Sequence, residues 1–210
     1  MFNFKNSYGL LIMVSLNILL LFLYNHIIFT DYFYITTLSN RYDYDKIISL
    51  ISFNRKIEWT TYVLFPLVYI LKIISLTSIV YIGIKLFEIA ISFRDCIKII
   101  IIAECIPVII AIFKILYFYI YPPNSIYEFQ YFNPFGLSFF FKNDAIPQYL
   151  MYPLLQLNLF EVVYWCTLAY GIKLLGTISY RKAFQITASG YGVGMTIWIL
   201  FIVFLQLQFS

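Results

Sequence analysis

Residues 148–183 read QYLMYPLLQLNLFEVVYWCTLAYGIKLLGTISYRKA. Their apolar part, from Tyr149 to Ile172, is long enough to cross the roughly 30 Å hydrocarbon core of a bilayer as a helix. Glu161 lies near the middle of this run, Asn158 precedes it by about one turn, and a short basic loop follows the run. An apolar run of this length that carries a carboxylate and ends in a basic loop indicates a polytopic membrane protein.

The composition of the whole chain points the same way. Of its 210 residues, 62% are hydrophobic and 11% are charged, whereas soluble domains average about 45–50% apolar and about 25% charged residues. A soluble domain of this size could not hide so much apolar surface, so we expect lipid to be the solvent. The net charge of +4 fits basic residues held on the cytoplasmic side, and no basic cluster is dense enough for nucleic acid.

The pattern of apolar runs predicts an all-α fold, an integral membrane five-helix bundle that forms a single transmembrane domain over residues 1–210. The spans are expected at about residues 10–29, 62–84, 97–121, 149–172 and 187–204. Lys46–Phe53 has the pattern of a short interfacial helix and is too short to cross. Residues 122–147 contain four prolines and are predicted to form an aromatic loop at the membrane surface.

Basic residues set the expected orientation. Five spans place the two termini on opposite sides of the membrane. If the N-terminus is cytoplasmic, the short basic connectors after the second and fourth spans lie inside, and the aromatic loop lies outside. We therefore expect a multi-pass protein of the plasma membrane with a cytoplasmic N-terminus.

Charged residues within the predicted spans are the first candidates for function. A charge near the bilayer centre costs roughly 2.5–3.5 kcal/mol on insertion scales, so it needs a partner or water. Counting residues from the outer span ends puts Lys72 and Glu161 at similar depth, which predicts a Lys72–Glu161 ion pair with Asn158 as a possible third member. Ser75 and Ser78 continue the helical stripe that begins at Lys72.

The third span adds two more charges. Glu104 is expected to reach a basic group of an inner connector, Lys114 to snorkel outward, and Pro107 to kink the helix. The predicted intramembrane polar cluster is therefore Lys72, Ser75, Ser78, Glu104, Lys114, Asn158 and Glu161. Such a cluster can line a proton or substrate path, or it can be a structural clasp that fixes helix register. The pattern favours the clasp, because transporter cores usually show more inward polar residues and more broken helices.

Two further sets of residues have less specific interpretations. Gly190 and Gly194 have small-xxx-small spacing in the last span, which predicts a helix-packing face. The single histidine and the three cysteines show neither a metal-binding nor a catalytic spacing. We therefore expect no catalytic residues, no metal and no cofactor.

The fourth and fifth spans carry a family pattern. A Leu-Asn-apolar-Phe start contains Asn158 and Phe160, glycines follow near the end of the span, and Arg181-Lys182-Ala183 open the last span. This pattern resembles the C-terminal core of the Yip1 family, mainly over residues 148–205. The resemblance implies a small polytopic bundle of the bacterial inner membrane. It does not carry over the Rab binding of eukaryotic members, because only about nine residues precede the first span here.

The function predicted from these features is a non-enzymatic inner-membrane subunit or scaffold that binds other membrane proteins or a second copy of itself. The alternative is a transporter or channel subunit for a small solute, peptide or lipid that uses Lys72, Glu104 and Glu161. A water-filled cavity that reaches those residues would favour the alternative. A membrane-embedded enzyme ranks third.

Overall fold

The computed structural model describes residues 6–39, 41–133, 135–136 and 147–209. Within these ranges the regular secondary structure is helical, and one isolated bridge joins Gly136 and Asn158. Five helical segments are long and apolar enough to cross a membrane. The predicted all-α class with five spans is confirmed.

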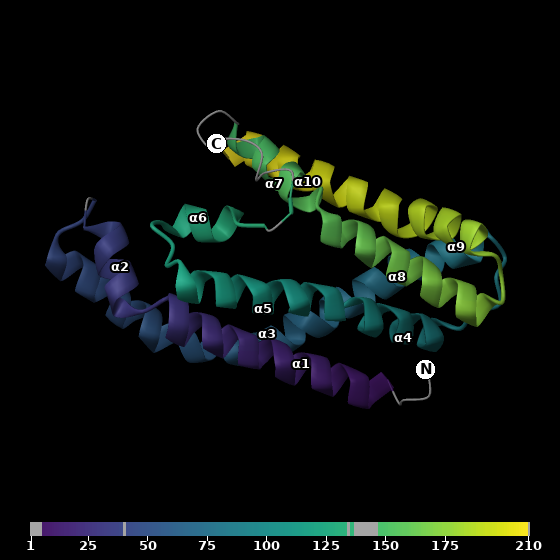
Figure 1. Cartoon of the computed structure of the whole chain (residues 1–210), viewed down its shortest axis with the longest axis horizontal. Coiled ribbons are helices and arrows are strands. Elements are labelled where there is room, and N and C mark those ends of the chain that lie inside the picture. Colours follow the sequence, from purple (N-terminus) through teal and green to yellow (C-terminus); the bar gives the residue numbers. More distant parts are fainter. Residues whose placement is uncertain (1–5, 40, 134, 137–146, 210) are drawn as a thin grey trace.

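The spans run alternately up and down the long axis of the molecule (Figure 1). Each is made of one to three helical elements, and the candidate spans are Asn6–Ile28, Tyr44–Leu86, Phe93–Ile120, Leu159–Gly176 and Tyr180–Gln208. The elements are α1 (Asn6–Leu23), η1 (Tyr24–Ile28), α2 (Asp31–Leu38), α3 (Tyr44–Leu86), α4 (Phe93–Ala103), α5 (Cys105–Ile120), α6 (Ile126–Tyr131), α7 (Gln148–Gln156), α8 (Leu159–Gly176), α9 (Tyr180–Thr187), η4 (Ala188–Gly192) and α10 (Val193–Phe209).

The second span begins far earlier than predicted. α3 is one helix of 43 residues, about 65 Å long at helical rise, and the expected interfacial helix at Lys46–Phe53 forms its first turns instead of a separate element. The sequence between Phe53 and Thr61 contains neither glycine nor proline, so nothing interrupts the helix there.

The predicted fourth span, 149–172, is in fact two helices. α7 ends at Gln156 and α8 begins at Leu159, because Asn158 leaves the helical conformation and becomes the N-cap of α8. Its side-chain oxygen accepts the backbone N–H of Glu161 at 2.8 Å, as N-cap asparagines commonly do. Figure 1 shows α7 packed beside α10, while α8 continues along the bundle.

The described part of the predicted aromatic loop contains one short helix. α6 places Phe129 against Phe118 of α5, with ring centroids 5.4 Å apart, so this part of the segment packs on the bundle. Residues 137–146 of the predicted loop lie outside the described residues.

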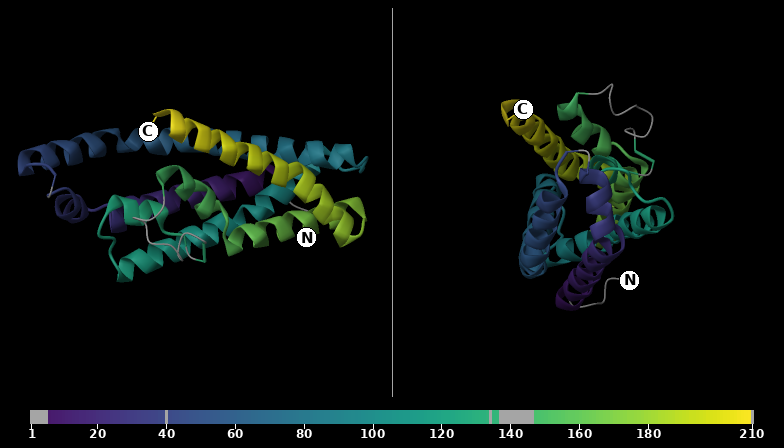
Figure 2. Two further views of the ribbon diagram at one scale, coloured as in Figure 1. Left: turned by 90° about the horizontal axis from the view of Figure 1, so that it is seen from above. Right: turned by 90° about the vertical axis from the view of Figure 1, so that its left-hand side faces the viewer.

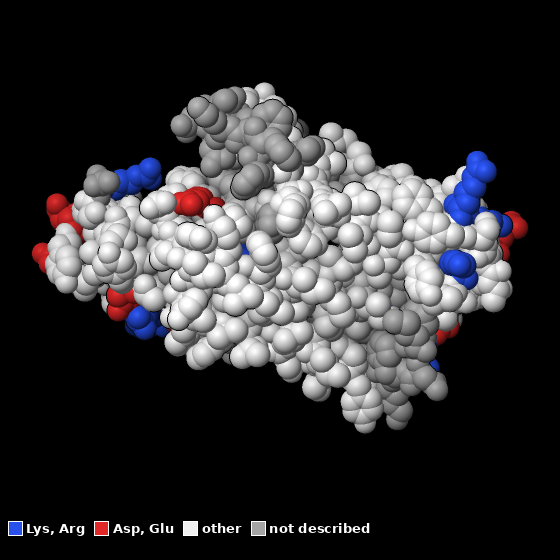
Figure 3. All heavy atoms as spheres, viewed as in Figure 1, with Lys and Arg blue, Asp and Glu red and all other residues white. Residues whose placement is uncertain are grey.

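Most of the completely buried side chains lie towards one end of the bundle, where α3 and α8 end and α4 and α9 begin (Figures 1 and 2). They include Ile84, Ile99, Ile100, Leu168, Ile172 and Ile186. On the face shown in Figure 3, charged residues gather at the two ends of the molecule, and the surface between them is almost free of charge. The apolar surfaces of the spans imply contact with a lipid bilayer.

Small residues bring the middle of a π-helical turn close to α3. A Cβ atom added at Gly83 would lie 2.8 Å from the Cα of Gly190 and 3.0 Å from the carbonyl oxygen of Ile186. The π-helix η4 begins two residues before Gly190. Gly190 therefore packs on α3 of the same chain, and Gly194 faces Ile79 of α3.

Gly83→Ala is expected to destabilise the protein, because the new methyl group would press on backbone atoms that cannot rotate away. Such overpacking costs about 1–3 kcal/mol, which should lower the thermal unfolding midpoint in detergent. Gly176→Ala is the matched control, since its nearest new neighbours would be side-chain atoms of Ile89, Ile91 and Ile178 and not backbone atoms. Equal midpoints for the two variants would contradict the close backbone contact.

Candidate functional site

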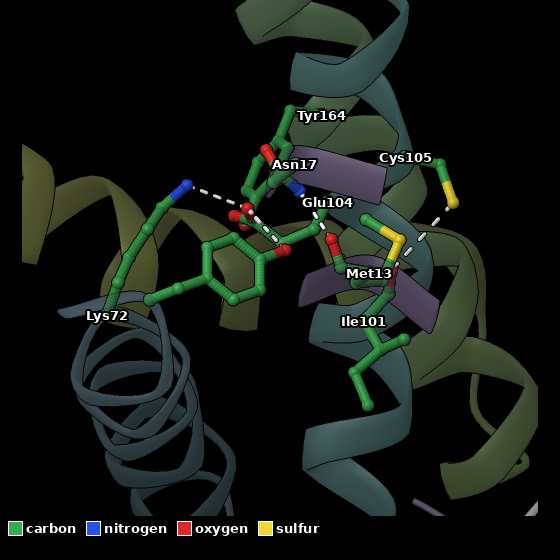
Figure 4. A network of polar contacts seen from close by, with 8 residues as sticks. Met13, Asn17, Lys72, Ile101, Glu104, Cys105 and Tyr164 are labelled. Atoms are coloured by element: carbon green, nitrogen blue, oxygen red, sulfur yellow. Dashed lines mark hydrogen bonds and ion pairs between the residues drawn. The ribbon is translucent and has the colours of Figure 1, made fainter. Parts of the chain in front are cut away.

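The most buried charge among the described residues is the carboxylate of Glu104, which is 2% exposed. The ammonium group of Lys72 on α3 lies 2.7 Å from Glu104 Oε2. The hydroxyl of Tyr69 donates to the same oxygen at 3.4 Å, and the hydroxyl of Tyr164 donates to Oε1 at 3.3 Å. Figure 4 shows Lys72 and Tyr164 approaching Glu104 from different helices. One carboxylate thus links α3, α4 and α8.

The predicted Lys72–Glu161 pair is wrong, since Lys72 pairs with Glu104. The depth comparison behind it took Tyr62 and Tyr149 as the outer ends of the two spans. The helix that carries Lys72 begins at Tyr44, and the helix that carries Glu161 begins at Leu159. Glu161 therefore lies in the first turn of α8. The predicted basic partner of Glu104 from an inner connector is replaced by Lys72.

Glu104 lies at an interruption of the third span. α4 ends at Ala103 and α5 begins at Cys105. Pro107 has no backbone N–H, so the carbonyl group of Ala103 cannot receive the usual hydrogen bond from the residue four positions later. The interruption thus falls one turn before the proline that was expected to bend this helix.

Glu161 has a different environment. Its Oε1 accepts hydrogen bonds from Trp165 Nε1 and from the Tyr191 hydroxyl, both at 2.9 Å. The described part of the chain shows no salt bridge to Glu161. Asn158 contributes to this region by capping α8 and does not bind either carboxylate.

Two tyrosines connect the carboxylates. The ring centroids of Tyr164, which donates to Glu104, and Tyr191, which donates to Glu161, are 5.2 Å apart. The hydrogen bonds of Glu104 and those of Glu161 therefore form two adjoining parts of one network, joined by this ring contact, from α3 through α8 to η4. The π-helical turn η4 supplies Tyr191, in keeping with the frequent occurrence of π-bulges at functional sites.

A cavity of about 360 Å³ opens beside this network. Its volume is near the lower end of the roughly 300–1,000 Å³ found for small-molecule sites. It is bounded by η1, α5, α8, the end of α6 and the residues after it, the end of α7, and Asn158. Its polar lining groups are Lys114, Gln130, Asn133, Gln156, Asn158, Glu161, Tyr24 and Tyr164.

Two of these groups have a polar atom without an ionic or hydrogen-bonding partner among the described residues. The ammonium group of Lys114 lies 4.1 Å from the ring centre of Phe129, so this residue sits among aromatic side chains at the cavity. Asn133 donates to the carbonyl oxygen of Leu155 at 2.7 Å. Its Oδ1 atom is buried and has no hydrogen-bond partner among the residues for which coordinates are described. A buried acceptor of this kind is costly unless something donates to it.

A second cavity of similar volume lies at the end of the bundle, between α2 and α3. Its polar groups satisfy one another: Arg55 Nη2 is 2.7 Å from Asp31 Oδ1, and Asn25 donates to Glu58 at 3.0 Å. Burial raises the pKa of Tyr34 at this cavity, and the negative charge of Glu58 adds to the increase. These paired groups leave fewer free donors and acceptors than the cavity at Glu161.

The remaining predicted site residues do not join the network. Ser78 donates to the carbonyl oxygen of Ile74 in its own helix at 2.9 Å, and Ser75 is exposed. Over the described ranges, no group of three or more His, Cys, Asp or Glu side chains is arranged to hold a metal ion.

Sequence reasoning missed the hydrogen-bonding aromatic residues and Asn133. Trp165 follows Glu161 by four residues and donates to its carboxylate, so helical spacing could have placed this pair together. Tyr69 and Tyr164 donate to Glu104 on another helix, which helical spacing does not indicate. The abundance of tyrosine, 20 in this chain, made single tyrosines hard to single out.

Comparisons of the chain with protein-family models, with curated proteins and with solved structures find no match.

Lys72→Met should destabilise the protein, because it leaves the Glu104 carboxylate buried without its cation. Glu104 is enclosed but the Lys72 side chain is 46% exposed, so the expected loss is about 2 kcal/mol, less than for a fully buried ion pair. It is measured as the free energy of unfolding in mixed micelles. Lys72→Met/Glu104→Gln should recover part of this loss, since no uncompensated charge remains.

The control for this experiment is Arg55→Met. Arg55 forms an ion pair with Asp31 in which the two side chains are 61% and 54% exposed. Such exposed pairs contribute at most about 1 kcal/mol to stability. If Lys72→Met proves as mild as Arg55→Met, the Lys72–Glu104 pair is not a stabilising contact.

Proposed function

We propose that this multi-pass membrane protein binds a small polar solute inside the bundle and acts as a transporter or channel subunit. The observation that supports this most directly is the cavity that contains both Lys114 and Glu161. Charged groups are expensive within a membrane and usually mark a path or a binding site when they line an aqueous space.

Interrupted helices support the same proposal. The third span breaks at Glu104, and α7 and α8 are separated at Leu157–Asn158. Broken helices that surround a polar site near the bilayer midplane are a recurring feature of secondary transporters. The sequence pattern favoured a structural clasp because it indicated few broken helices. The two interruptions in the structure therefore support transport instead.

The scaffold remains the second candidate, and one feature of α10 favours it. Five exposed apolar residues follow one another at alternating spacings of four and three residues, and they are Val193, Ile197, Leu200, Phe204 and Leu207. This heptad-like spacing is typical of a seam that packs on another helix. The C-terminal part of α10 lies at the edge of the bundle (Figure 2). The face of Gly190 and Gly194, which the sequence predicted to pack on another helix, is occupied by α3 of the same chain.

The family and the compartment are proposals too. We keep the Yip1-like assignment and the bacterial inner membrane on the residues that carry the resemblance. We propose a cytoplasmic N-terminus because the end where α4 begins and α8 ends is the more basic one. Its charged residues are Lys85, Glu88, Arg94, Asp95, Lys98, Lys173, Arg181 and Lys182, whereas the described charges at the other end are Asp31, Arg41, Asp43, Asp45, Lys46, Arg55, Lys56, Glu58 and Glu128. Excess basic residues mark the cytoplasmic side.

Single cysteines should report this orientation in intact cells. In a variant whose three native cysteines are serine, Lys46→Cys should react with a membrane-impermeant maleimide, and Lys182→Cys should react only after permeabilisation. Both positions are exposed, so access through the membrane is the only expected difference. The reverse labelling pattern would overturn the proposed orientation.

Proteoliposomes test transport directly. Purified protein should take up at least one member of a labelled panel of small amino acids, amines and carboxylates above the level of empty liposomes. Glu161→Gln and Lys114→Met should each reduce this uptake roughly 10–100-fold, because loss of one charged hydrogen-bonding partner costs about 1–3 kcal/mol.

Lys56→Met is the control for this experiment, since Lys56 is exposed outside the cavity; it should retain full uptake. Absence of uptake by the wild-type protein, together with a partner that co-purifies from the native membrane, would favour the scaffold over transport.

A further inference from the structure

The cavity at Glu161 holds opposite charges that do not meet. Lys114 on α5 and Glu161 on α8 both line it, and no salt bridge joins them. Unlike charges in a medium of low dielectric constant attract strongly. The cavity between them has room for a small solute.

The polar groups of the cavity fall into two kinds. Glu161 and the buried Oδ1 atom of Asn133 are acceptors, and Asn133 Oδ1 has no donor among the described residues. Lys114 is a cation, and its partner at 4.1 Å is an aromatic ring and not an acid. The acceptors suit a ligand group with several N–H donors, and Lys114 suits an anionic group.

The cavity also has an apolar part. Ile106, Ile110, Ala111 and Leu155 line it together with aromatic residues. A ligand with a short hydrocarbon segment between its two charged groups would match this lining, because burial of CH₂ groups away from water is favourable. A fully hydrated inorganic ion would not use it.

We propose that the ligand of this cavity is a small zwitterion, with a primary ammonium group bound by Glu161 and Asn133 and an acid group bound by Lys114. The inference rests on the proposed binding function and specifies its ligand class. A free amino acid and the headgroup of phosphatidylethanolamine share this chemistry.

The test compares four solutes of similar size with the purified full chain. These are γ-aminobutyrate, butylammonium, butyrate and butanamide, and the readout is the shift of the thermal unfolding midpoint with concentration, which reports binding to the folded state. We expect γ-aminobutyrate to bind at least about tenfold more tightly than either single ion, which corresponds to about 1.4 kcal/mol. Glu161→Gln and Lys114→Met should each remove this preference, and Lys56→Met should keep it.

Nanodiscs distinguish the two sources of the ligand. If a lipid headgroup fills the cavity, phosphatidylethanolamine should raise the midpoint relative to phosphatidylcholine, whose quaternary ammonium group has no N–H donor, and γ-aminobutyrate should then add nothing. If a free solute is the ligand, the two lipids should behave alike and γ-aminobutyrate should stabilise the protein in both. Either result supports the zwitterion.

Two results would count against it in different ways. Equal or tighter binding of butylammonium or butyrate would overturn the zwitterion and leave the proposed binding function intact. No stabilisation by any solute or by phosphatidylethanolamine would overturn both. Because the comparison of solutes uses the wild-type chain, it holds even if a variant fails to fold.

Discussion

The arrangement of this bundle depends on the ion pair between Lys72 and Glu104. In a bilayer a buried carboxylate cannot turn to water, so it must be satisfied by the chain itself. Lys72, Tyr69 and Tyr164 do so from two different helices. The pair therefore fixes the height of α3 against the third span, and Tyr164 fixes α8 to both. The rest of the polar network is built outward from this point.

Interruptions in two of the predicted spans also shape the bundle. Pro107 and Asn158 each end a helix within the stretch that the apolar pattern assigns to one span. Their effects differ, since proline removes a donor whereas asparagine supplies an acceptor that starts a new helix. Both interruptions border the cavity at Glu161. Two local features of the sequence thus make room for a ligand where continuous helices would pack closely.

The sequence was sufficient for the five spans, because long apolar runs are a strong signal. It was not sufficient for the ion pair, because depth is counted from helix ends, and these ends were placed wrongly at Tyr62 and Tyr149. The gap at Asn158 could have been foreseen from Asn158 and Glu161, whose spacing resembles a capping box. The bond from Tyr191 to Glu161 could not, because Tyr191 reaches it from 30 residues away in the chain. Long-range contacts between single polar residues leave no periodic trace.

The unequal packing along the bundle has a mechanical consequence. Ile84, Ile100 and Leu168 are wholly enclosed where α3, α4 and α8 meet, and close-packed interiors resist deformation. The cavity at Glu161 and the cavity between α2 and α3 both lie in the other half of the bundle. Thermal motion of the helices should therefore be largest around the two cavities and smallest where α3, α4 and α8 pack closely. Access to Glu161 can then widen or narrow by flexing of α5, α6 and α7 while the basic end of the bundle keeps its shape.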